Sequence, residues 1–100
     1  MDIEITQNRE SVIVAIVGRL DTLTSSELEQ KLRTYFSIQG LHLVVDCCAM
    51  EYVSSAGLRV ILMAHKSVTA NGGCFVIRNI SKDVRSVFDI TGLSRILTIE

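Results

Sequence analysis

The sequence predicts an α/β fold built on a mixed, largely parallel sheet with helices, in the order β-β-α-β-α-β-α-β, that opens with an antiparallel hairpin. Short β-branched apolar runs alternate with segments of helical periodicity, and strands separated by helices imply right-handed crossovers and parallel pairing. With 100 residues, 48% of them apolar and only 5% aromatic, the chain is expected to form a single domain over 1–100 with a core of Val, Ile and Leu.

The opening hairpin is predicted from two strand patterns separated by a turn. Ile3 and Ile5 alternate with polar neighbours, which is typical of a half-exposed strand. Residues 7–10 are polar and predict the turn, and the β-branched run from Ser11 to Val17 predicts a buried strand.

The first helix is expected to start at a capping box formed by Thr24 and Glu27, in which each side chain bonds the other's backbone N–H. Its apolar face would carry Leu28, Leu32, Tyr35 and Phe36. Gly40 is expected to close this segment.

The second half of the chain alternates strands and helices. Buried strands are expected at 41–45, ending at Asp46, and at 74–77, with a last short strand at 97–99. A helix is expected from Ser55 to about residue 71, where Asn-Gly-Gly is a strong stop signal. Another helix is expected between a Ser81 cap and Gly92, at a position that requires a left-handed backbone.

Composition narrows the classes of function. The net charge of −1 leaves no electrostatic footprint for nucleic acid or an anionic membrane, and no apolar run approaches the roughly 18 residues of a membrane span. Three cysteines without a secretory leader indicate reduced thiols and a cytoplasmic protein. The adjacent Cys47 and Cys48 point oppositely in extended chain, so buried small hydrophobes are expected rather than a redox pair.

No cofactor or metal ion is expected. His42 and His65 have no metal-ligand spacing with the cysteines. The chain has neither a phosphate-binding loop nor a dinucleotide-binding fingerprint. The spacing of its serine, histidine and acidic residues also does not indicate a catalytic triad.

The most informative stretch is 52–62, Y-V-S-S-A-G-L-R-V-I-L, where a strand or loop meets a helix start. Partners of such folds meet the carboxyl ends of the strands, and this edge is expected to carry Asp21, Asp46 and residues 52–57. Local chemistry fits a helix cap by Ser54 or Ser55. It also fits a phosphate on Ser55, because a helix N-terminus tolerates negative charge, and Gly57 could let another molecule approach closely.

This stretch resembles the phosphorylation-site motif of bacterial anti-sigma factor antagonists, the stand-alone STAS domains. Residues 18–21, G-R-L-D, resemble the segment before that family's first helix, and 84–93, V-R-S-V-F-D-I-T-G-L, resemble its late helix and turn. The resemblance implies a STAS-like fold with Ser55 as the phosphorylated serine. Ser54 stands where the family often has aspartate, and Ala56 where it often has serine or threonine.

The resemblance further implies a cycle without catalysis by this chain. An anti-sigma factor that is also a serine kinase phosphorylates the protein, and a serine phosphatase resets it. The dephosphorylated form binds the kinase and frees the sigma factor. The residues expected to bind the partner are Asp21, Asp46, Ser54, Ser55, Ala56, Gly57 and Arg59. The family usually adds a final helix, whereas this sequence stops at Glu100 in an expected strand.

Two alternatives remain open on the sequence. The chain could be a STAS subunit that docks on a lipid transporter or a stress-signalling complex. From a different class, Asp46 at a strand end could be the phosphorylated aspartate of a receiver-like domain, although no acidic pair or late lysine accompanies it. Asp46 could equally cap a loop.

Overall fold

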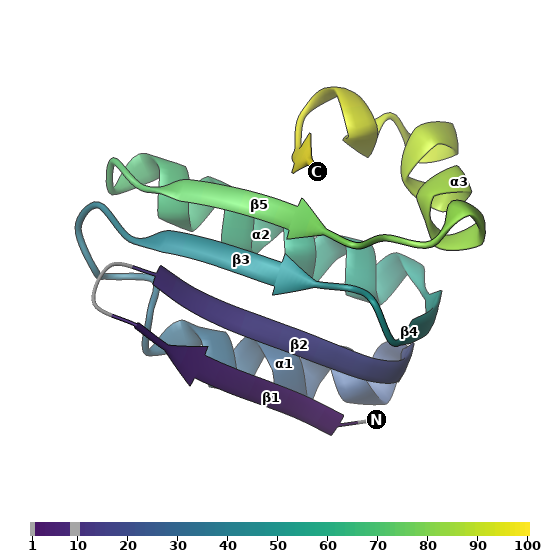
Figure 1. The fold of residues 1–100 in the computed structure, drawn as a ribbon, viewed down its shortest axis with the longest axis horizontal. Coiled ribbons are helices and arrows are strands. Elements are labelled where there is room, and N and C mark those ends of the chain that lie inside the picture. The colour runs from purple at the N-terminus through teal and green to yellow at the C-terminus, as the bar shows by residue number, and fades with distance from the viewer. Residues whose placement is uncertain (1, 9–10) are drawn as a thin grey trace.

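The computed structural model describes residues 2–8 and 11–100 and confirms the predicted order of elements, with one strand added (Figure 1). The predicted turn at 7–10 falls partly outside the described residues. The strands are β1 (Asp2–Gln7), β2 (Ser11–Leu20), β3 (His42–Asp46), β4 (Met50–Val53), β5 (Cys74–Arg78) and β6 (Thr98–Ile99). The helices are α1 (Thr22–Arg33), α2 (Ser55–Ala70) and α3 (Lys82–Thr91), followed by a 3-10 turn, η1 (Leu93–Arg95).

The sheet is mixed and largely parallel, as predicted. Its strand order is β1-β2-β3-β5-β6; β1 pairs with β2 antiparallel and the other neighbours pair in parallel. The opening hairpin is therefore confirmed. Parallel pairing follows from the helices that connect the central strands.

The strand that the sequence analysis missed is β4. The ten-residue β2 extends beyond the five-residue β3, and β4 pairs in parallel with the part of β2 that β3 leaves free. The change of neighbour coincides with a bulge between Gly18 and Arg19, where Gly18 adopts a positive φ of 94°. Only four residues long, β4 lacks a periodic apolar pattern that would predict it.

Helices α1 and α2 lie side by side behind the sheet, whereas α3 lies beyond the end of β5 (Figure 1). The core forms between the sheet and these two helices and extends to α3, whose Val84 and Phe88 belong to the same buried cluster. Alternate residues of β2 point into it, namely Val12, Val14 and Ile16, and all are almost completely buried. Helices contribute the matching apolar positions, which include Leu28, Leu32, Ile61, Ala64 and Val68.

The start of α1 corrects the predicted capping box. Asp21 is the N-cap: its carboxylate accepts the Thr24 N–H at 3.0 Å, and Thr24 Oγ1 accepts the Asp21 N–H at 2.8 Å. Thr24 therefore fills the third helical position rather than the cap, and Glu27 lies one turn further on. The same reciprocal bonding occurs, shifted by three residues. The helix also ends earlier than expected, at Arg33.

The cysteines differ in exposure. Cys47 is completely buried in the core, as predicted, but Cys48 is exposed and so is Cys74. Burial, with a smaller effect of the Asp46 charge, raises the pKa of the Cys47 thiol to about 12. Because the thiolate is the nucleophile, Cys47 is protected both by its position and by its protonation.

We expect a thiol-alkylating reagent to modify the folded protein at two cysteines. Cys48 and Cys74 should react at neutral pH, and Cys47 should react only after unfolding in urea, since it is buried and protonated. Mass spectrometry of digested protein would assign the sites. Modification of Cys47 under native conditions at the same rate as Cys74 would contradict the burial described here.

Candidate functional site

The N-termini of α1 and α2 lie next to each other because two parallel strands end together. Leu20 of β2 and Val53 of β4 are register partners, and the Ser54 N–H donates to the Leu20 carbonyl at 2.9 Å. The residues that follow, Asp21 and Ser54, are the N-caps of α1 and α2. This edge of the sheet is the one at which the sequence analysis expected a partner to bind.

The two serines of the motif have different roles in the structure. Ser54 is the cap: its Oγ accepts the Gly57 N–H at 3.2 Å, and its carbonyl accepts the Leu58 N–H at 2.9 Å. Ser55 is the first residue of α2, and its side chain is exposed. Its hydroxyl forms no hydrogen bond to any part of the chain that the structure describes. Capping is thus complete without Ser55.

Gly57 allows the first turn of α2 to pack directly on the end of β2. A Cβ at this buried position would lie 2.9 Å from Cδ2 of Leu20 and 3.0 Å from its carbonyl oxygen. Real Cβ atoms do not approach other atoms so closely, so the absent side chain faces the protein interior. The hypothesis that Gly57 lets another molecule approach is therefore wrong; the close neighbour is Leu20.

Ala56 and Arg59 border a shallow groove between α1 and α2. The groove has a volume of about 180 Å³, and α1 contributes Thr22, Ser26 and Glu29 to it. Arg59 is exposed. The groove thus presents polar side chains of both helices next to the first turn of α2.

Asp21 is ionised and held in place by its capping bonds. The backbone N–H of Thr24, followed by the Thr24 hydroxyl, stabilises the carboxylate and lowers the pKa of Asp21 below its ordinary value of 3.8. A smaller effect comes from the nearby Arg19 charge. Asp21 therefore brings a negative charge to this surface and fixes the start of α1.

The structure does not bring Asp46 into this group. Asp46 pairs with Ala15, which lies five residues before Leu20 on β2. Asp46 is therefore roughly 15 Å from the Leu20 end of β2, measured along the strand. Its Oδ1 accepts the Cys48 N–H at 3.0 Å and the Asn79 amide at 3.3 Å. The geometry thus supports the loop-cap interpretation of Asp46.

Two exposed features at this edge of the sheet, the Arg19–Tyr52 stack and Leu23, were not predicted from the sequence. Arg19 stacks on the ring of Tyr52, its register partner in β4, with 4.1 Å between guanidinium carbon and ring centroid. Leu23 stands in the first turn of α1 with 82% of its surface exposed. The sequence could have revealed this exposed leucine, because Leu23 lies away from the apolar face of α1. Arg19 and Tyr52 could not be paired without knowledge of β4.

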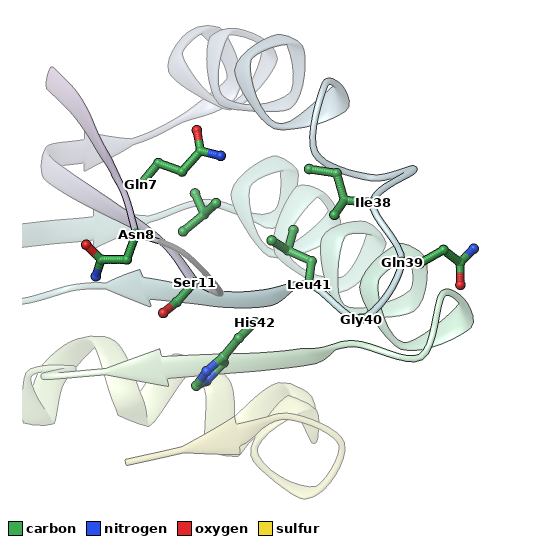
Figure 2. Close-up of a pocket in the computed structure, with 9 residues that line it drawn as sticks. Gln7, Asn8, Ser11, Ile38, Gln39, Gly40, Leu41 and His42 are labelled. Atoms are coloured by element: carbon green, nitrogen blue, oxygen red, sulfur yellow. The ribbon is translucent and has the colours of Figure 1, made fainter.

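A larger pocket of about 440 Å³ lies at the opposite end of the sheet, near the start of β3. Figure 2 shows its amide and hydroxyl groups on Gln7, Asn8, Ser11 and Gln39, together with His42. Its lining offers no set of acid, base and nucleophile. Over residues 2–8 and 11–100, no three potential metal ligands gather at one place, and no helix is long and apolar enough to cross a membrane.

Comparisons with known proteins agree along the whole chain. The model of the STAS domain family matches residues 2–100. The anti-sigma-B factor antagonist of Bacillus subtilis is 31% identical over 99 residues, which cover 99% of this chain and 90% of the relative. The anti-sigma F factor antagonist of Paenibacillus polymyxa is 28% identical over 100 residues, covering 99% and 86% respectively.

Solved structures show the same fold at lower identity. The anti-sigma factor antagonist SpoIIAA in its unphosphorylated form matches with a TM-score of 0.84 at 20% identity, covering 99% of this chain and 88% of that one. The phosphorylated form of SpoIIAA from Bacillus matches with a TM-score of 0.77 at 19% identity, covering 99% and 91%.

We expect Gly57→Ala to lower the free energy of unfolding by about 1–3 kcal/mol, because the added methyl group is forced against Leu20. Urea unfolding followed by circular dichroism would measure the change. An ordinary glycine-to-alanine change within a helix stabilises by up to about 1 kcal/mol. A gain in stability would therefore show that no steric conflict exists.

Asp21 should make stability depend on acid pH. Since its folded-state pKa lies below 3.8, the ionised form stabilises the fold above that value, and this contribution is lost as the pH falls through the lowered pKa. Asp21→Asn keeps a capping oxygen but does not titrate. Urea midpoints measured between about pH 2.5 and 7 should fall less steeply for this variant. Equal slopes would contradict the assignment.

Proposed function

The chain belongs to the STAS domain family, as an anti-sigma factor antagonist, and we propose that phosphorylation of Ser55 controls its binding to an anti-sigma factor. In the unphosphorylated state the surface formed by Asp21, Ser54, Ser55, Ala56 and Arg59 binds the anti-sigma factor, which then releases its sigma factor; Gly57 is buried beneath this surface against Leu20. In the phosphorylated state this binding is lost.

The observation that carries the proposal is the free Ser55 hydroxyl. It is exposed on the first residue of α2, and the capping bond is made by its neighbour Ser54. A kinase would therefore reach Ser55 without unfolding the domain. The modification would break no hydrogen bond of the described fold.

The negative charge of a phosphate on Ser55 would be the physical cause of the loss of binding. A phosphate adds about −1.5 to −2 charges, and the N-terminus of α2 accommodates them through its partial positive charge of about one half. At an interface, like charges placed together cost several kcal/mol, whereas about 1.4 kcal/mol already changes affinity tenfold. One phosphate on Ser55 is therefore sufficient to end binding.

The partners follow from this cycle. The anti-sigma factor would itself be the serine kinase, and a separate serine phosphatase would restore the binding form. The protein would act in the cytoplasm as a substrate and binding partner, and it would catalyse no reaction. Asp46 has no part in this proposal, because its side chain serves the loop after β3.

The test begins with phosphorylation. The chain is incubated with an anti-sigma factor kinase from the same organism and ATP, and peptides are examined by mass spectrometry. We expect one phosphate, on Ser55, in the wild-type protein and in Ser54→Ala, and none in Ser55→Ala. Ser54→Ala should lose about 1 kcal/mol of stability with its cap, so the two variants separate capping from signalling.

Binding completes the test. Ser55→Ala should bind the anti-sigma factor even after incubation with ATP, and Ser55→Asp should bind at least about tenfold more weakly. Phosphate on another residue alone, or full affinity of Ser55→Asp, would overturn the proposal. Stable capture of a transporter or stress-complex subunit by the unmodified protein, with no binding to the kinase, would favour the docking-subunit alternative.

A further inference from the structure

Arg59 and Ser55 form an i,i+4 pair on the exposed surface of α2. Residues four apart on a helix have Cβ atoms about 5–6 Å from each other. Helical side chains also tilt toward the N-terminus, so the long Arg59 side chain lies over the turn that contains Ser55. Both residues are exposed.

The Arg59 guanidinium is available in the unmodified protein. The ion pairs of the described chain join Lys31 to Glu27, Arg33 to Glu29, Arg78 to Asp46 and Arg85 to Asp89. Arg59 takes part in none of them. Glu29 lines the groove between α1 and α2 together with Arg59, but its carboxylate forms an ion pair with Arg33.

The other cation near the motif is engaged elsewhere. Arg19 stacks on Tyr52, and both side chains lie on the face of the sheet opposite to their buried neighbours Leu20 and Val53. The α2 helix packs on the buried side of that sheet. Arg19 is therefore turned away from the α2 surface that holds Ser55 and Arg59.

We propose that Arg59 is the intramolecular partner of the Ser55 phosphate. This inference rests on the proposed phosphorylation of Ser55. The planar guanidinium pairs with two phosphate oxygens through charge-assisted hydrogen bonds. Phosphorylation then changes two side chains of the binding surface: Ser55 gains a dianion, and Arg59 is withdrawn from any acidic group of the partner.

The test uses phosphoserine inserted at position 55 during translation, so that no kinase is needed. Phosphorus NMR titration at low ionic strength measures the second pKa of the phosphoserine. We expect a value lower by roughly 0.2–0.7 in the wild-type background than in Arg59→Gln, the range for an exposed ion pair. Arg59→Lys should recover part of the difference, since lysine retains the charge without the planar fork.

Lys66→Gln is the matched control. Lys66 is exposed on the same helix, eleven residues after Ser55 and so roughly 16 Å further along it. Its loss should leave the phosphoserine pKa unchanged, and high salt should reduce the Arg59 effect.

Equal pKa values with and without Arg59, or an equal shift in Lys66→Gln, would overturn the pairing. Neither result would affect the proposed function, which depends on kinase modification and partner binding. Conversely, failure of a kinase to modify Ser55 would refute the proposed function and leave the measured pairing in place.

Discussion

The contact between the end of β2 and the first turn of α2 positions everything else at the candidate site. Leu20 is completely buried, its carbonyl accepts the Ser54 N–H, and its side chain occupies the space beside Gly57. This one residue thus holds β4 in register and determines how closely α2 approaches the sheet. The same strand end leads into Asp21, which begins α1. Both helix starts therefore share one rigid support.

This rigid support matters for the proposed function, in which Ser54 stabilises the start of α2 and Ser55 is the residue that is phosphorylated. Ser54 satisfies an amide of α2 that would otherwise lack a partner. Ser55 lies in the same turn, is exposed to solvent, and forms no side-chain hydrogen bond within the described part of the chain. A covalent change on Ser55 can consequently alter the surface while the core remains intact. A single serine with both roles would couple signalling to partial unfolding of the helix.

Charge explains why the proposed phosphorylation of Ser55 would be sufficient to change binding. The chain carries a net charge of −1, so a phosphate of about −1.5 to −2 brings it to roughly −3. That charge is concentrated at the helix start, beside the ionised Asp21 and the cation of Arg59. Salt in the solvent screens distant charges. The affinity of a partner would therefore depend more on how the charges near Ser55 are arranged than on the net charge of the chain.

The sequence by itself determined the features that depend on neighbours along the chain. The β2 strand, the Ser81 cap and Gly92 at the end of α3, and the α2 start at Ser55 were all predictable, because strand composition and helix capping are local. The motif that suggests Ser55 as the phosphorylated residue likewise lies in one contiguous stretch.

Tertiary structure alone decided the features that depend on distant partners. β4 forms because β2 extends beyond the end of β3 and leaves backbone groups free to pair. A glycine is required at position 57 because Leu20, 37 positions earlier in the chain, lies too close to leave room for a side chain. The sequence predicted Thr24 as the cap of α1, whereas the structure has Asp21 there, directly after the end of β2. Asp46 was separated from the candidate site by strand register. Such pairings are contacts across the sheet, and no local pattern in the sequence specifies them.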